Sequence, residues 1–310
     1  MKVICLGLDP AGLYLAALLK KSGAAGDVEI VEGPGLAAPA PPHVMAHPLK
    51  PGARLADDQL DRAITPASRS VRGVRMRAPQ VDRSTDNQTY GFIDAVTLRD
   101  LVRERARELG CRLTSGPTPT SAALADADLV IVAEGAESPT RAAHGGAFGT
   151  VIESSRTRHF SFDVDLASER LEYWFHRTAH GVVQASLTPA GAASVLRVET
   201  TVQALEAAGL VGADAATITR FCAETFAGEL AGASLHPRDA GWRSFSHLRN
   251  ANWSAGHLLL VGAAAYNAHP SVGLDMRMAM ADAEAFAEAL AKGGSVPETL
   301  KAAEAACRPK

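Results

Sequence analysis

The stretch GLDPAG, residues 7–12, stands between a short apolar run and a helical pattern of leucines. Gly7 and Gly12 have the spacing of the outer glycines in the turn G-x-G-x-x-G, which joins the first strand and helix of dinucleotide-binding sheets. Asp9 takes the place of the middle glycine. In the motif, that glycine lets the backbone approach a pyrophosphate closely. Asp9 before Pro10 is also a good helix N-cap. As a cap, its carboxylate would satisfy N–H groups that a pyrophosphate would otherwise occupy.

The segments around this turn predict a βαβ arrangement. Lys2–Gly7 is short and apolar, as in a buried parallel strand, and Gly12–Lys21 spaces its leucines as a helix does. Val28–Glu32 is a second strand that ends in an acid.

Two further apolar strands end in glycine-bearing turns. Ala125–Ala133 leads to a turn at Gly135, and Gly256–Val261 leads to a turn at Gly262. Helical patterns cover residues 92–109 and 276–291. These blocks predict an α/β domain with a parallel sheet, assembled from the first, middle and last parts of the chain.

The remaining segments predict an insertion. Residues 151–249 contain partly alternating runs that favour strands, followed by helical patterns at 201–208 and 215–228. Residues 33–90 predict a Pro- and Gly-rich loop and then an exposed, arginine-rich strand. We expect a discontinuous dinucleotide-binding domain formed by 1–45, 88–150 and 250–310, and an inserted strand-rich domain formed by 46–87 and 151–249.

Composition argues against several classes of protein. The 310 residues carry a net charge of −3, with acids and bases interspersed, which argues against a nucleic-acid surface. No run reaches the roughly 18 apolar residues of a membrane span, and the start of the sequence lacks the pattern of a secretory leader. The four cysteines are far apart without C-x-x-C spacing. We therefore expect a cytoplasmic protein with reduced thiols.

Three segments together resemble the flavoprotein aromatic hydroxylases of the para-hydroxybenzoate hydroxylase type: MKVICLGLDPAGLYLAALLKK, DADLVIVAEGAESPTR and HLLLVGAAAYNAHPSVGLDMRMAMADAEAFAEAL. The likeness is greatest to the branch with violacein-pathway, aminobenzoyl-CoA and salicylyl-CoA hydroxylases, which LEYWFHRTAHG, LRVET and GWRSF also resemble. The resemblance implies a Rossmann-like FAD/NAD(P)-binding parallel sheet domain with an inserted strand-rich substrate domain. It also implies FAD- and NAD(P)H-dependent hydroxylation of a planar aromatic or CoA-linked intermediate of specialised metabolism.

Residue by residue, the resemblance assigns FAD contacts to Gly7, Gly12, Glu32, Gly135, Gly262 and Gly273, with Glu32 on the ribose hydroxyls. Four positions depart from the family. Asp9 replaces the middle glycine, Gly33 replaces an arginine, Ala263 replaces the aspartate of a Gly-Asp pair, and Asp275 replaces a second glycine. Asp9 would place negative charge near a diphosphate, and Asp275 would disfavour the anionic reduced flavin. These departures weigh against tight FAD binding.

Aromatic residues make up only 5% of the chain, and several come from segments that would line the substrate. The candidates for stacking on a planar ligand are Trp174, His176, Trp242, Phe245 and Tyr266. Core packing is the alternative, because consecutive residues of a strand face opposite sides. His269 is the candidate for acid–base work, since imidazole transfers protons near neutral pH, and a hydrogen-bonding or surface histidine is its alternative. No metal-ligand spacing is found.

Three functions stay open at this point. The first is an FAD- and NAD(P)H-dependent monooxygenase. The second is a pseudo-flavoenzyme without FAD that catalyses a cyclisation, hydrolysis or rearrangement in the same cleft. The third is an inert partner of a related hydroxylase. The expected ligand is a small planar metabolite, and the sequence leaves open a homodimer or a partner enzyme.

Overall fold

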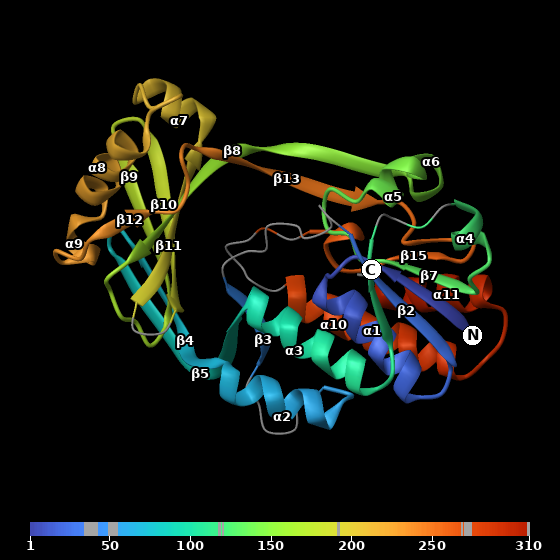
Figure 1. Cartoon of the computed structure of the whole chain (residues 1–310). Helices are drawn as coiled ribbons and strands as arrows, with labels where there is room; N and C mark the ends of the chain where they lie inside the picture. Colours follow the sequence, from blue (N-terminus) through green and yellow to red (C-terminus); the bar gives the residue numbers. More distant parts are fainter. Residues whose placement is uncertain are drawn as a thin grey trace.

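The computed structural model describes residues 1–33, 43–48, 55–116, 119, 121–190, 193–267, 269 and 275–308. They form a six-stranded sheet and a nine-stranded sheet, which lie at opposite ends of the molecule in Figure 1. The long strands β8 (Thr150–Val164) and β13 (Arg243–Asn250) run from one end to the other. Residues 268 and 270–274 are not described, so the prediction for Gly273 lies outside the described residues.

The six-stranded sheet is parallel except at one edge. Its order is β14 (Ser254–Ala255), β15 (Leu258–Leu260), β7 (Leu129–Val132), β1 (Lys2–Leu6), β2 (Asp27–Glu32) and β6 (Arg112–Ser115), with β14 antiparallel. The accompanying long helices are α1 (Pro10–Lys21), α3 (Ala95–Glu108), α10 (Asp275–Ala291) and α11 (Val296–Cys307). Shorter helices lie at the strand ends: α4 (Ser121–Ala125), α5 (Pro139–Ala143), α6 (Gly145–Phe148) and the 3-10 turn η1 (Gly262–Ala264).

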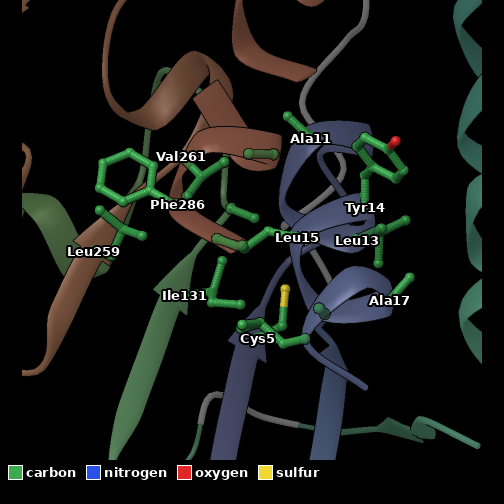
Figure 2. Close-up of a cluster of buried hydrophobic side chains, with 14 of the residues drawn as sticks. Cys5, Ala11, Leu13, Tyr14, Leu15, Ala17, Ile131, Leu259, Val261 and Phe286 are labelled. Atoms are coloured by element: carbon green, nitrogen blue, oxygen red, sulfur yellow. The ribbon is translucent and has the colours of Figure 1, made fainter. Parts of the chain in front are cut away.

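A hydrophobic core joins this sheet to its helices. Figure 2 shows Cys5 of β1, Leu15 of α1, Ile131 of β7 and Phe286 of α10 in one cluster, all at most 1% exposed. Burying a large apolar side chain contributes about 1.5–3 kcal/mol. The core thus holds the turn between β1 and α1 against the ends of β7 and β15.

The nine-stranded sheet has the order β12 (Leu235–Pro237), β8, β11 (Ala193–Thr201), β10 (Gly181–Ala190), β9 (Leu171–Thr178), β4 (Arg69–Ala78), β5 (Val81–Asp94) and β3 (His43–Pro48), with β13 paired to β8. Its neighbours are antiparallel apart from the parallel pair β4 and β9. Helices α7 (Val202–Ala207), α8 (Ala215–Thr225) and α9 (Ala227–Leu230) lie on the side away from the six-stranded sheet (Figure 1).

Alternation gives the nine-stranded sheet two different faces. Phe160, Phe162 and Trp174 point toward α8 and α9, where they form a second core with Phe226. Their strand neighbours must point the other way, because successive side chains of a strand face opposite sides. We call this opposite side the inner face.

The predicted α/β architecture, a parallel sheet with a strand-rich second part, is confirmed. The described residues between 33 and 90 contain the expected arginine-rich strand, β4, and also β3, α2 (Asp58–Ala67) and most of β5. The predicted boundaries at 45/46 and 87/88 fall inside β3 and β5, which both pair within the nine-stranded sheet. In the described part of the chain, no helix combines the length and apolarity needed to cross a membrane.

Candidate functional site

The turn between β1 and α1 is closely packed. Asp9 N donates to the carbonyl oxygen of Ala133, at the end of β7, over 3.1 Å. A Cβ atom at Gly12 would overlap the Cβ of Ala133, so only glycine allows α1 this approach. The spacing of Gly7 and Gly12 therefore serves the packing of helix on sheet, whatever the turn binds.

Asp9 is the N-cap of α1, and its side chain also binds a turn that is distant in the sequence. Its Oδ1 accepts from Ala11 N at 3.0 Å, with Pro10 in the first turn of the helix. Its Oδ2 accepts from Ala263 N at 3.1 Å, in the distant turn η1. A Cβ atom at Gly262 would overlap the carboxylate. Asp9 thus links the first glycine turn to the third, and its predicted role as N-cap is confirmed.

The Asp9 side chain lies in an enclosed position. Although the residue is partly exposed, its carboxyl group is surrounded by protein. Burial raises the pKa of Asp9 to about 6, and the N–H groups of Ala263 and Ala11 act in the opposite direction. The group is therefore mainly ionised at neutral pH, between two backbone N–H donors.

Glu32, at the end of β2, also has a partner within the chain. Arg103 of α3 binds it through two atoms: Nη2 donates to Oε2 at 3.1 Å, and Nε donates to Oε1. A bidentate pair of this kind engages both oxygens of the carboxylate. Arg103 comes from a helix 71 residues later in the chain, so the sequence around Glu32 gives no sign of it.

The second turn forms a buried polar clamp. Glu134 accepts from Thr140 N at 3.0 Å, from Thr140 Oγ1 at 2.9 Å and from the Ser138 hydroxyl. Arg141 donates to the carbonyl oxygen of Ala264 at 3.1 Å and thereby joins this turn to the third one. The three turns, at Gly7, Gly135 and Gly262, therefore form one connected assembly.

A polar group occupies the inner face of the nine-stranded sheet. We call it the inner-face cluster; it consists of His159 on β8, Gln184 on β10, Arg197 and Glu199 on β11, and the adjoining His269 and Phe245. Glu199 Oε1 lies 3.1 Å from His269 Nε2, and Glu199 Oε2 accepts from Gln184 Nε2 at 3.0 Å. The rings of Phe245 and His269 meet edge to face at 5.2 Å between centroids.

Burial, hydrogen bonds and neighbouring charges together set the protonation of the cluster. Burial would raise the pKa of Glu199, but hydrogen bonds from His269, Thr157 and Gln184 hold it below the ordinary value. Burial and the nearby Arg197 lower the pKa of His159 to about 4, so this imidazole is neutral at pH 7. The cluster therefore combines an ionised carboxylate with a neutral imidazole.

Arg197 carries an unsatisfied donor. Its Nε is enclosed and has no acceptor among the residues that the structure describes. Burial lowers the pKa of Arg197, and the acids Asp239, Glu199 and Asp275 oppose this effect. An arginine remains charged even so, and an enclosed N–H without an acceptor is costly unless a ligand satisfies it. Asp275, at the start of α10, thus acts on the inner face through its charge.

The structure brings together two of the six predicted ligand residues, Phe245 and His269. Trp174 is 1% exposed and packs on Phe226 in the second core. His176 pairs with Glu229 of α9 at 3.0 Å, on the same side of the sheet. These two side chains lie on the face opposite the inner-face cluster, and both contact Phe226 of the second core.

The other two aromatics also lie within packed surroundings. Trp242 contacts Phe160 edge to face at 6.0 Å and adjoins the second core. Tyr266 stacks on Trp253 at 5.1 Å and donates its hydroxyl to Asp282 at 2.7 Å. They adjoin different cores, so they do not form one aromatic wall.

Sequence reasoning missed the strand residues of the inner-face cluster. The signal for them is present, because in RHFSFD and LRVET polar residues alternate with residues of the second core. Charged residues in the interior of a strand, with apolar neighbours on the other side, indicate a polar face that meets a ligand or another domain.

Curated relatives cover the whole chain. The 3-hydroxy-4-methyl-anthranilyl-[aryl-carrier protein] 5-monooxygenase of Streptosporangium sibiricum is 31% identical over 322 residues, which cover 100% of this chain and 84% of the relative. The chain belongs to the flavoprotein aromatic monooxygenases. Salicyloyl-CoA 5-hydroxylase of a Streptomyces species is 30% identical over all of this chain, which spans 62% of that relative. Protodeoxyviolaceinate monooxygenase of Chromobacterium violaceum is 26% identical, over 97% of this chain and 82% of the relative.

Solved structures of flavoprotein monooxygenases have the same fold. A structure of 2-methyl-3-hydroxypyridine-5-carboxylic acid oxygenase has a TM-score of 0.76 at 18% identity and covers 99% of this chain and 87% of that one. PqsL, described as a probable FAD-dependent monooxygenase from Pseudomonas aeruginosa, has a TM-score of 0.73 at 19% identity, with coverage of 99% and 91%. No family model matches the chain.

Related flavoprotein monooxygenases use FAD with NAD(P)H. The pyrophosphate of FAD does not fit the first turn of this flavoprotein monooxygenase while the Asp9 carboxylate accepts from Ala11 N and Ala263 N. The carboxylate fills the space against Gly262 and accepts from Ala11 N and Ala263 N, at the helix terminus where such folds place phosphate oxygens. Ala263, in place of an aspartate, offers no side-chain acceptor.

Proposed function

We propose that the chain hydroxylates a small planar aromatic molecule in specialised metabolism, which is the class of reaction that its relatives perform. The substrate is a free aromatic acid or its acyl thioester. The observation that carries this proposal is the inner-face cluster. There the enclosed Nε of Arg197 has no acceptor among the described residues, and an imidazole–carboxylate pair belongs to the same cluster. The names of two relatives specify aromatic acyl groups on a carrier protein or on coenzyme A.

Arg197 gives the ligand its polar anchor. A carboxylate, a thioester carbonyl or a phenolate would satisfy its open N–H, and charged acceptors form the stronger bonds with arginine. The Phe245 ring, beside His269, offers an apolar edge to an aromatic ring. Polar anchoring next to an aromatic contact suits a planar ring that carries an oxygen substituent.

The Glu199–His269 pair is suited to holding a proton. The ionised Glu199 lies 3.1 Å from Nε2 of the imidazole and orients it. His269 can then accept a proton from a phenolic or anilinic group of the ligand, which increases the electron density of the ring. The neutral His159 is a second candidate for a hydrogen bond to the ligand.

A direct test uses purified protein with salicyloyl-CoA, NADPH and FAD in large excess, with the product analysed by mass spectrometry. The proposal predicts a product heavier by one oxygen atom. We expect Arg197→Gln to raise KM and His269→Asn to lower kcat, whereas Arg249→Gln, which removes an exposed pair with Glu153, leaves both unchanged. Absence of oxygenated product from a panel of aromatic acids and their CoA thioesters, at saturating FAD, would contradict the proposal.

The two alternative functions, a non-redox enzyme and an inert partner, are not favoured by the relatives. A solved structure with the same fold is described as the tetrameric form of 2-methyl-3-hydroxypyridine-5-carboxylic acid oxygenase, while a homodimer or a partner enzyme for this chain stays a prediction. A cytoplasmic location likewise stays a prediction.

A further inference from the structure

Two positions in this fold normally contact the adenosine diphosphate half of a dinucleotide. One is the N-terminus of the first helix, where backbone N–H groups face the diphosphate, and the other is the acid at the end of the second strand, which accepts from ribose hydroxyls. In this chain, Asp9 occupies the first position and Arg103 engages the second.

Asp9 supplies the anion that the helix terminus favours. Its two oxygens accept from Ala11 N on the first turn and from Ala263 N on the third, over 3.0 and 3.1 Å. A diphosphate at this place would have to displace both bonds and would lie against a carboxylate of its own sign. The same carboxylate lies against Gly262, so Asp9 is a steric obstacle as well as an electrostatic one.

Arg103 plays the corresponding part at Glu32. Its guanidinium donates to both carboxylate oxygens, as two ribose hydroxyls would. The carboxylate of Asp9 is negatively charged, as the diphosphate would be. The guanidinium of Arg103 donates hydrogen bonds, as the ribose hydroxyls would. The two contacts lie on different elements and are independent observations.

We propose that the dinucleotide site of this chain is self-capped: Asp9 and Arg103 take the contacts of diphosphate and ribose, so that the chain folds without FAD and binds it weakly and exchangeably. This inference concerns the cofactor and does not rest on the substrate proposed above. It predicts that FAD is taken up from solution in competition with Asp9.

The experiment compares the affinities of FAD and ADP for wild type, Asp9→Gly and Asp9→Asn by isothermal titration calorimetry. Removal of one charge-assisted contact of about 1.5 kcal/mol corresponds to about a tenfold change in affinity, so we expect Asp9→Gly to bind FAD at least ~10-fold more tightly. ADP lacks the flavin and should show the same gain, which locates the effect in the turn. Asp9→Asn, which retains the side-chain volume, should gain less.

Matched controls separate this effect from loss of a helix cap. Asp214 caps α8 through Thr217 N and lies on the far side of the second sheet, so Asp214→Gly should not change FAD affinity. Arg103→Gln should also tighten ADP binding, whereas Arg107→Gln, on the same helix but paired with Glu104, should not.

Wild type with a submicromolar FAD affinity, or an Asp9→Gly variant that gains neither FAD nor ADP affinity, would overturn the proposal. If Asp9→Gly does not fold, unchanged ADP affinity in both Asp9→Asn and Arg103→Gln would do so. Tight FAD binding by wild type would leave the proposed hydroxylation intact. Conversely, an Asp9→Gly variant that holds FAD but oxygenates no aromatic ligand would count against the proposed function alone.

Discussion

Asp9 makes the stability of the fold depend on pH in a direction opposite to that of most surface acids. Its pKa rises from the ordinary value of 3.8 to about 6 in the folded chain, because burial disfavours the charged form. The folded state therefore holds this proton more tightly than the unfolded state between about pH 4 and pH 6. Protonated Asp9 therefore stabilises the fold fully at pH values below its pKa in the unfolded chain. This stabilisation is lost as the pH rises through the pKa of Asp9 in the folded chain.

The gap between these two values corresponds to about 3 kcal/mol at pH 7. The variant Asp9→Asn removes this titration while it retains an acceptor for Ala11 N. We expect the free energy of unfolding of Asp9→Asn, relative to wild type, to rise by about 2.4 kcal/mol from pH 4 to pH 7, the part of the full effect that lies in this range. The neighbouring Cys5 thiol does not contribute, because burial raises its pKa and keeps it protonated throughout.

The assay is urea unfolding of both proteins at half-unit steps of pH, followed by circular dichroism. Asp214→Asn is the control, since bonds from Thr217 lower the pKa of this exposed cap and no trend is expected above pH 4. A difference between Asp9→Asn and wild type that stays constant, or that falls with rising pH, would refute the burial of an ionised carboxylate in this turn.

Three further predictions concern packing and reactivity. Phe226→Ala should lower the free energy of unfolding by about 3–5 kcal/mol in urea titrations, because this fully buried ring joins α8 to Trp174 and His176. For Gly12→Ala we expect a loss of about 1–3 kcal/mol, since the new methyl group overlaps Ala133; a loss below about 0.5 kcal/mol would mean that α1 does not lie this close to β7. Alkylation followed by mass spectrometry should modify Cys307 well before Cys5 and Cys222, because Cys307 is partly exposed and the other two are buried; burial raises the pKa of all three thiols, so equal rates would contradict the buried positions of Cys5 and Cys222.

Local sequence patterns were sufficient for the parallel sheet and for the cap at Asp9. The strand before Gly7, the helix after it and the acid at residue 32 depend on neighbours within a few residues, and a capping residue needs only the helix that follows it. The second contact of the same side chain, to Ala263 N, spans 254 residues and could not be predicted from the turn alone.

The inner face was harder to predict for a related reason. Alternation divides each strand into two sets of side chains, but it does not say which set meets helices and which meets the other domain. Trp174 was a natural candidate for stacking because aromatics are rare here, yet it packs under α8 and α9, while the charged Arg197 and Glu199 face inward. Residues 33–90 were expected to form a Pro- and Gly-rich loop followed by an exposed, arginine-rich strand. Strand β4 matches that expectation, whereas α2 and the pairing of β4 with β5 were not predicted.

The self-capped site is tested most directly by the flavin content of the wild-type protein as purified. The protein is passed through gel filtration, and its visible absorption is recorded before and after addition of FAD. We predict far less than one flavin per chain after filtration, and recovery of the flavin spectrum only with excess FAD. One tightly retained FAD per chain would contradict the account, because the diphosphate and Asp9 cannot share the same N–H groups of Ala11 and Ala263.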